Sequence, residues 1–331
     1  MKKLEIPLLK LPTTIVLIDD NKLFLNSMTC KLSEKYLLKA YCNTSLALEE
    51  LSKKSLIKKF FLDAFEQANS KEIDIDIKHP IFDYNRLSEI VYSSDRFADT
   101  SVIVVDFCMP GQINGIELCS RLSEYPYRKT ILTGNADNKI AVDAFNNRII
   151  DRYITKDANN IIEELTELID CEIVWFFNNI SKLAPGWNVD RKNVSSEFSS
   201  IFNMVLEKNK ICEYYQVGDG EYLMLDDEAN IFWFVLQSEE NFKYFQQTAE
   251  YNEAPEKVIE LLNNKSHMIY LYSEYEKSLS VEYWSEYLFP VQGTLDGSRY
   301  TIIKEKSFSL KPEKIKSYKD YREGAEKVFP L

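Results

Sequence analysis

The sequence is poor in several features that would narrow its function at once. It has only two histidines, His79 and His267, so a histidine-rich metal site is excluded. Its six cysteines include no Cys-x-x-Cys pair, and Cys30 and Cys108 have apolar neighbours. This pattern favours reduced thiols that mostly fill the core. No run approaches the ~18 apolar residues that a membrane-spanning helix needs.

A secretion signal and a basic character are missing as well. The first seven residues are too polar and too broken for a signal peptide, so we expect a cytoplasmic protein. The net charge is −12, and residues 182–331 contribute −7 of it, with 18 basic and 25 acidic residues. Nucleic-acid binding needs a basic excess, and we find no helix-turn-helix pattern and no P-loop, so a DNA partner is disfavoured.

What the sequence does have is enough apolar material for two domains. It has 331 residues, of which 45% are hydrophobic and 13% aromatic. One stretch organises the first half of the chain: residues 102–105 are apolar and mostly β-branched, and they run into Asp106 and then a Met-Pro-Gly turn. This pattern is typical of a buried strand in a parallel sheet, with the acid at its carboxyl end.

Four further strands and the helices between them complete the prediction for this half. Strands are expected at 14–18, 38–42, 129–133 and 151–156. Helices are expected at 21–37, from Leu46 onward with Thr44 or Ser45 as the cap, after Asn114-Gly115, and at 136–145. Alternating strands and helices predict an α/β fold with a doubly wound five-stranded parallel sheet.

The expected strands bring polar side chains to one edge of the sheet. Ligand sites in such sheets lie outside the carboxyl ends of the strands. The residues at those ends are Asp19, Asp20, Asp106, Thr133 and Lys156. Clustered carboxylates repel one another and need a cation, and hard oxygen ligands suit Mg²⁺. A carboxylate held there can attack phosphorus, while the lysine and the threonine hydroxyl stabilise the phosphoryl oxygens.

These residues resemble the receiver domain of two-component response regulators. The acidic pair, the phosphoacceptor position followed by Met109-Pro110-Gly111 and Asn114-Gly115, the switch threonine and the lysine occur in the family's order. Tyr153 stands at the family's aromatic switch position. The resemblance covers roughly residues 13–170, apart from 52–98. Two departures are Gly134, where alanine is frequent, and Asp157, where many receivers have proline.

The resemblance implies a set of roles. Asp20, Asp106 and the backbone carbonyl of Cys108 would ligate Mg²⁺, and Asp19 would help through water. A histidine kinase or phosphotransfer protein would phosphorylate Asp106. Thr133 and Tyr153 would then move inward and change the face built by the last helices. No enzymatic activity is expected beyond self-catalysed phosphotransfer and dephosphorylation.

We predict three parts along the chain. The receiver domain covers residues 1–157 with an insertion at 52–98, which is either a partner surface or a structural elaboration. A connector helix covers 158–184 and ends at Ala184-Pro185-Gly186. A largely apolar stripe runs along it through positions 161, 162, 165, 168, 169, 172 and 176. This stripe is either a dimer seam or a surface that packs onto the second domain.

The third part, residues 185–331, is expected to be a smaller α+β output domain of unknown type. Strands and a β-hairpin are expected between 213 and 236, helices at 194–208, 240–251 and 255–263, and strands at 267–272 and 298–303. Asp226-Asp227-Glu228 is either a cation site or the hairpin's solvated turn. The stretch from Lys304 to Lys319 is locally basic and is either a phosphate-binding surface or a solvated tail.

The layout also resembles the response regulators of α-hydroxyketone quorum-sensing systems, which is a resemblance of organisation rather than of residues. Two functions stay open for the output domain. It acts through protein contacts or homodimerisation, or it is an enzymatic or nucleotide-binding module that the receiver gates.

Overall fold

The structure is a computed structural model, and it describes residues 6–52, 84–111, 113–134, 138–157, 160–183, 195–272, 274–308 and 310–325. The chain divides into two compact units. Unit 1 comprises Met1–Asp76, Glu89–Trp187 and Lys316–Leu331, and unit 2 comprises Ile77–Ser88 and Asn188–Ile315. Residues 53–83 of the predicted insertion and the predicted boundary at 184–186 lie outside the described residues.

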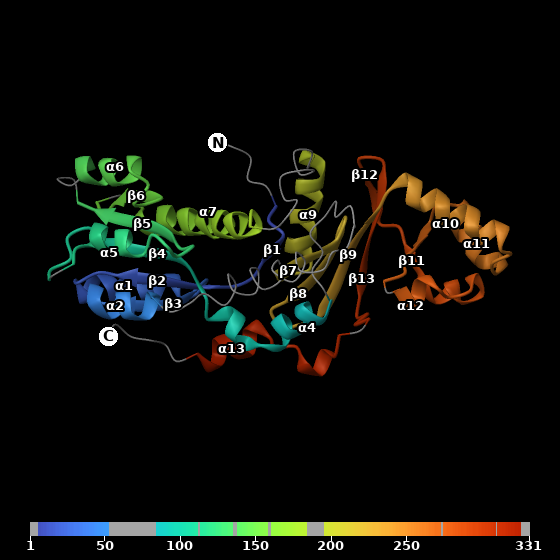
Figure 1. Ribbon diagram of the computed structural model, residues 1–331, viewed down its shortest axis with the longest axis horizontal. Coiled ribbons are helices and arrows are strands. Elements are labelled where there is room, and N and C mark those ends of the chain that lie inside the picture. Colours follow the sequence, from blue (N-terminus) through green and yellow to red (C-terminus); the bar gives the residue numbers. More distant parts are fainter. Residues whose placement is uncertain are drawn as a thin grey trace, which may run out of the picture. The chain divides into compact units, whose positions relative to one another are not determined.

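Unit 1 contains the expected parallel sheet (Figure 1). Its strands are β2 (Thr14–Ile18), β3 (Leu37–Tyr41), β4 (Thr100–Asp106), β5 (Arg128–Thr133) and β6 (Arg152–Thr155). They run in the order β3-β2-β4-β5-β6, and every neighbouring pair is parallel. A short strand β1 (Leu9–Lys10) precedes them. The predicted doubly wound five-stranded sheet is therefore confirmed.

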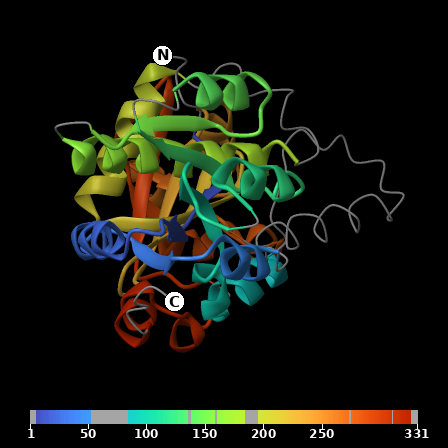
Figure 2. The same ribbon diagram turned by 90° about the vertical axis from the view of Figure 1, so that its left-hand side faces the viewer.

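Helices cover both faces of this sheet, as Figure 2 shows. On one face, α1 (Lys22–Leu32) and α7 (Ile161–Ser181) pack their apolar side chains against β2 and β4. On the other face lie α2 (Thr44–Leu51), α5 (Gly115–Arg121) and α6 (Asn138–Asn146). The middle strands are buried from both sides, which explains their continuous runs of Val, Ile and Leu.

Two helix boundaries differ from the prediction for local reasons. Helix α1 ends at Leu32 rather than at 37, because the chain turns there into β3. Helix α2 is capped by Asn43, whose side chain accepts hydrogen bonds from the backbone of Ser45 and Leu46. Thr44 is not the cap because it is buried, and its hydroxyl donates to the carbonyl of Ile113 at 2.9 Å.

The connector helix α7 carries a buried charge in its largely apolar stripe. Glu172 is fully buried, and its carboxylate lies 2.6 Å from Nε of Arg128 and 3.1 Å from Nε of Arg152. Arg128 also pairs with Asp151 at 2.6 Å. These contacts join the amino ends of β5 and β6 to α7. Further along α7, Phe176 and Phe177 are fully buried within the chain.

The described end of the insertion forms α4 (Tyr84–Tyr92) and the 3₁₀ helix η1 (Ser94–Phe97). Arg96 is buried and donates to the carbonyls of Val91, Ser93 and Lys316. The Phe97 ring contacts Tyr318 and Tyr321 of α13 (Tyr318–Gly324), with centroids 5.4 Å away in each case. These contacts explain why Lys316–Leu331 groups with unit 1.

Unit 2 is built on an antiparallel sheet with the strand order β7-β8-β9-β13-β12. Its strands are β7 (Ile211–Gly218), β8 (Glu221–Asp226), β9 (Ile231–Gln237), β12 (Gly293–Leu295) and β13 (Ser298–Lys304), with a separate pair β10 (His267–Ile269) and β11 (Leu288–Pro290). Its helices are α9 (Ser196–Lys208), α10 (Glu239–Tyr251), α11 (Glu256–Asn263), α12 (Glu274–Lys277), and the 3₁₀ turns η4 (Val281–Tyr287) and η5 (Pro312–Lys314). The expected smaller α+β domain is confirmed.

The expected β-hairpin is β8–β9, and its turn uses the acidic residues internally. One carboxylate oxygen of Asp226 accepts hydrogen bonds from the backbone N–H of Glu228 and of Asn230. Its other oxygen accepts from the side-chain amide of Asn230 at 2.8 Å. Asp226 therefore organises the turn, which agrees with the interpretation of this acidic stretch as the hairpin's solvated turn.

The core of unit 2 is aromatic. Phe202 of α9 is fully buried, and its ring lies between 4.8 and 5.7 Å from four other rings. Those rings belong to Phe198, Tyr214, Tyr222 and Phe234. Aromatic pairs in tilted and edge-to-face arrangements add to the energy of burial.

The cysteines only partly follow the prediction. Cys119 is buried, but Cys30 and Cys108 are exposed, so the interpretation of these two as core residues is wrong. Cys30 lies on the solvent side of α1, between the inward-facing Met28 and Leu32, and Cys108 follows the end of β4. Over the residues that the structure describes, no helix combines the length and hydropathy needed to cross a membrane.

Candidate functional site

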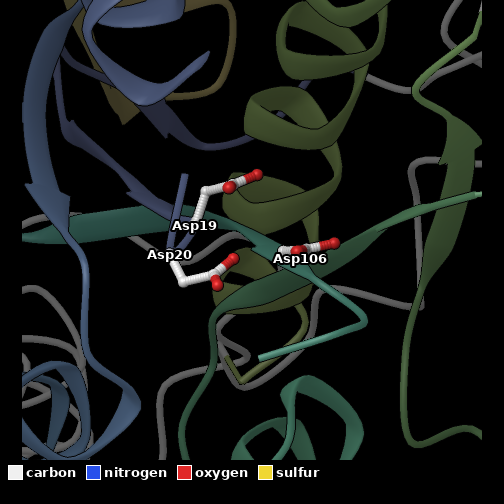
Figure 3. A group of neighbouring side chains, drawn as sticks. All are labelled: Asp19, Asp20 and Asp106. Carbon is white, nitrogen blue, oxygen red and sulfur yellow. The ribbon is translucent and has the colours of Figure 1, made fainter. Parts of the chain in front are cut away.

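Three carboxylates meet at the carboxyl edge of the parallel sheet (Figure 3). Asp19 and Asp20 follow β2, and Asp106 is the last residue of β4. The β2–β4 register pairs Ile18 with Val105, so the residues that follow each strand lie side by side. One oxygen from each of the three carboxylates lies within 4.8 Å of the others. Asp19 and Asp106 are buried, and Asp20 is exposed.

Lys156 connects two of these acids. It follows β6, and its backbone N–H donates to the carbonyl of Thr133 at 2.9 Å, which fixes the start of its loop. Its Nζ lies 2.7 Å from Asp19 and 2.9 Å from Asp106. The ring of Phe24 lies 5.0 Å from the same Nζ. Sequence reasoning missed Phe24, because the sequence shows it only as part of the helix expected at 21–37.

The charges of this group are strongly coupled. Burial works to lower the pKa of Lys156, but the hydrogen bonds to Asp19 and Asp106 outweigh it, so this pKa lies above its usual range. Lys156 is therefore a cation at neutral pH. Burial raises the pKa of Asp19, against the hydrogen bonds from Lys156 and from the backbone N–H of Asn21. An added cation would relieve this burial penalty on the Asp19 charge.

Thr133 and Tyr153 lie on the neighbouring strands. Thr133 ends β5, is fully buried, and donates its hydroxyl hydrogen bond to the carbonyl of Gly134 at 3.0 Å. Tyr153 on β6 is 39% exposed, and its ring meets Phe145 of α6 edge-on at 6.3 Å. The structure therefore places Thr133 at the carboxylate edge, whereas Tyr153 is turned toward solvent.

One glycine is needed for the shape of the site. A Cβ on Gly115 would lie 2.2 Å from the carbonyl oxygen of Asp106, so no other residue fits without moving the backbone. The sequence showed Asn114-Gly115 as a motif but gave no reason for it. The reason is the close approach of α5 to the end of β4, with Asn114 capping α5 by accepting from the backbone of Glu117.

The residues present fit a magnesium ion. The donor set consists of carboxylates, which are the hard oxygen ligands that Mg²⁺ prefers. Two of them are buried, and a single lysine lies within ion-pair distance of both. Asp19, Asp20 and Asp106 are thus placed to hold a cation.

This fold and this site are similar to those of one class of protein, the response regulators, in which an N-terminal receiver domain is followed by an output domain. The particular protein that it resembles is the response regulator LqsR of Legionella pneumophila. The two structures align over 99% of each chain with a TM-score of 0.76 and 26% sequence identity. This likeness confirms the resemblance to the response regulators of α-hydroxyketone quorum-sensing systems.

Other comparisons are weaker. An adenylate cyclase structure from Rhodopirellula baltica aligns with a TM-score of 0.34 and 22% identity, over 52% of this chain and 94% of that chain. A CheY-like receiver domain protein from Methanospirillum hungatei aligns with a TM-score of 0.32 and 17% identity, over 51% and 98%. Neither a protein-family model nor a curated protein matches the sequence.

Proposed function

We propose that Asp106 accepts a phosphoryl group from a histidine kinase or a phosphotransfer protein and so switches the output domain. The observation that carries this proposal is the convergence of three carboxylates and one lysine at the carboxyl edge of the sheet, with Nζ of Lys156 2.9 Å from Asp106. The whole-chain likeness to a response regulator supports the same assignment.

The chemistry needs little beyond alignment and neutralisation of charge. A carboxylate oxygen of Asp106 attacks phosphorus, so a new P–O bond forms while the P–N bond to the donor's histidine breaks. Lys156 neutralises charge on the phosphoryl oxygens, and the Thr133 hydroxyl donates a hydrogen bond to one of them. A Mg²⁺ ion held by Asp19, Asp20, Asp106 and the Cys108 carbonyl would supply further neutralisation of the same oxygens.

The switch follows from the contacts that phosphorylation changes. In the structure Thr133 bonds Gly134 and Tyr153 is exposed. A phosphoryl group on Asp106 attracts the Thr133 hydroxyl, and the space that Thr133 leaves draws Tyr153 inward. This movement alters the α6–β6 face, where the apolar side chains of Ile140, Phe145 and Tyr153 are exposed. We propose that this face forms a homodimer when Asp106 is phosphorylated.

The remaining parts of the proposal follow from this role. The protein would act in the cytoplasm as a quorum-sensing regulator, and its output would use protein contacts rather than DNA, in keeping with its acidic charge. It would have no enzymatic activity beyond its own phosphorylation and dephosphorylation.

Labelling tests the phosphoacceptor. The full-length chain, incubated with Mg²⁺ and acetyl phosphate, should gain one phosphoryl group per molecule, and hydroxylamine should remove it because the bond is an acyl phosphate. Asp106→Asn should abolish the label, and EDTA should suppress it. Asp143→Asn changes an exposed aspartate of α6 and should label like wild type. Full labelling of Asp106→Asn, measured by intact mass, would overturn the assignment.

Light scattering tests the dimer separately. The molar mass should double when Mg²⁺ and beryllium fluoride, a phosphoryl mimic, are added to the wild type. Asp106→Asn should keep its original mass, because it cannot bind the mimic. Phe145→Glu should take up phosphate normally but stay monomeric, because it places a charge on the α6–β6 face. An unchanged mass in the wild type would remove dimerisation from the proposal and leave the phosphoacceptor standing.

A further inference from the structure

Unit 2 contains a hollow that the proposed phosphorylation does not use. Its volume is about 410 Å³, and it lies between helix α9 and strand β13. Pockets that hold small molecules usually have volumes of ~300–1,000 Å³. The hollow is therefore large enough for a small organic ligand.

Two regular elements supply its walls. Tyr300, Ile302 and Lys304 belong to β13, and because alternate residues of a strand point to the same face, all three face the hollow. Met204 and Lys208 are four residues apart on α9 and therefore share one face of the helix. Each element thus contributes apolar side chains and one lysine, and Asn209 and Gln292 add polar groups to the lining.

The two lysines lack counter-charges. Among the described residues, neither Lys208 nor Lys304 forms an ion pair, and none of the described residues that line the hollow is acidic. Residues 182–331 carry a net charge of −7, so the hollow has a basic lining in an otherwise acidic part of the chain. Lys208 lies in the last turn of α9, where the helix dipole favours a cation. Lys304 ends β13, and its Nζ lies 5.4 Å from the centre of the Phe232 ring, so its described partner is an aromatic face and not a carboxylate.

A polar group also faces the ligand space. The Tyr300 ring stacks on Phe234, with centroids 5.7 Å apart, and is mostly buried. No described residue hydrogen-bonds its hydroxyl. Gly293 lies against this ring, and a Cβ there would come within 3.0 Å of the hydroxyl oxygen. The absence of a side chain at 293 therefore lets the Tyr300 ring pack closely against the backbone of Gly293.

We propose that this hollow binds a small amphipathic organic anion. The acid group lies between the ammonium groups of Lys208 and Lys304, and the Tyr300 hydroxyl donates a hydrogen bond to it. The apolar part of the ligand lies on Met204, Val205 and Ile302. The lining selects for a ligand with both an acid group and an apolar part. An inorganic anion does not contact the apolar side chains, and an uncharged lipid does not pair with the lysines. This site is independent of the proposed phosphorylation of Asp106.

The experiment uses octanoate as the probe and a methyl group as the reporter. Full-length protein labelled with ¹³C at the methionine methyls is titrated with octanoate, octanol or inorganic phosphate while its NMR spectrum is followed. Met204 lines the hollow, whereas Met28, Met109, Met224 and Met268 are buried elsewhere and act as internal references. Octanoate should shift the Met204 signal saturably, and octanol and phosphate should leave it in place.

Charge-removing variants complete the test. Replacing both Lys208 and Lys304 with Gln should weaken octanoate binding about tenfold, since each partly exposed ion pair contributes up to ~1 kcal/mol. Lys257→Gln removes an exposed lysine of α11 and should bind octanoate like wild type. Unmoved reference methyls show that each variant is folded. The proposal is overturned if Met204 does not respond to octanoate, responds equally to octanol or phosphate, or responds equally in the double variant.

Discussion

The two sheets of this protein place their polar groups differently. The parallel sheet of unit 1 has an aliphatic interior, and its charges gather at the strand ends: Asp19, Asp106 and Lys156 at the carboxyl edge, and the Glu172 network at the other. The antiparallel sheet of unit 2 has an aromatic interior around Phe202, and its unpaired lysines line a hollow on one face. In the first sheet topology fixes where a site forms; in the second, local packing does.

The largest effect is expected from the aromatic core of unit 2. Phe202→Ala removes a fully buried ring that touches four others, and it should lower the free energy of unfolding by about 4 kcal/mol. Urea unfolding followed by tryptophan fluorescence measures the change. Tyr244→Ala removes a ring that is 62% exposed, and it should cost less than about 1 kcal/mol. Similar losses for both variants would contradict an aromatic core centred on Phe202.

The same contrast explains what could be predicted from the sequence. In unit 1, strands that end in Asp19, Asp106, Thr133 and Lys156 were enough to place these side chains at one edge, because parallel strands share a carboxyl edge. Gly115 and Phe24 could not be assigned, since their roles depend on distances to Asp106 and Lys156 that no spacing encodes. The prediction for Cys108 as a core residue failed because an apolar neighbourhood in sequence does not give burial in a loop.

In unit 2 most strands and helices were predictable, but the short elements β11, β12 and α12 and the hollow were not. Its lysines come from positions 208 and 304, almost a hundred residues apart, and line one hollow only because the fold places it between α9 and β13. The sequence shows the basic stretch that begins at Lys304, but it does not show that Lys208 of α9 lines the same hollow. The position of a site on an antiparallel sheet depends on which helix covers which strands, and that is a tertiary property.

An intermediate loss of stability is expected when the buried ion pairs of the site are broken, and it should exceed the loss from breaking a surface pair. Lys156→Met leaves the buried carboxylates of Asp19 and Asp106 without their cation, and in EDTA it should destabilise the chain by about 2 kcal/mol. Added Mg²⁺ should recover part of this loss by replacing the missing charge. Lys35→Met breaks a pair with Asp170 whose two side chains are about half exposed, and it should cost at most ~1 kcal/mol. Equal costs in EDTA would show that the site has no special electrostatic role.

The smallest expected effect tests whether a buried carboxylate also lowers the stability of unit 2. Burial raises the pKa of Glu221, although its carboxylate accepts a hydrogen bond from the Tyr270 hydroxyl at 3.1 Å. A raised folded-state pKa contributes stability that is present below the unfolded value, about 4.3, and lost as the pH rises through the folded value. Glu221→Gln should therefore be more stable than wild type at pH 7.5, measured as a higher urea midpoint, and nearly equal to it at pH 4.

Glu239 provides the control of opposite sign. Its hydrogen bond with Arg299 lowers the pKa of Glu239, so its contribution to stability is present above the unfolded pKa and is lost as the pH falls through the folded one. Glu239→Gln should therefore lower the urea midpoint at pH 7.5, where Glu221→Gln raises it. Both carboxylates belong to the same unit, so a lowered midpoint for both variants would mean that burial of Glu221 does not oppose its ionisation.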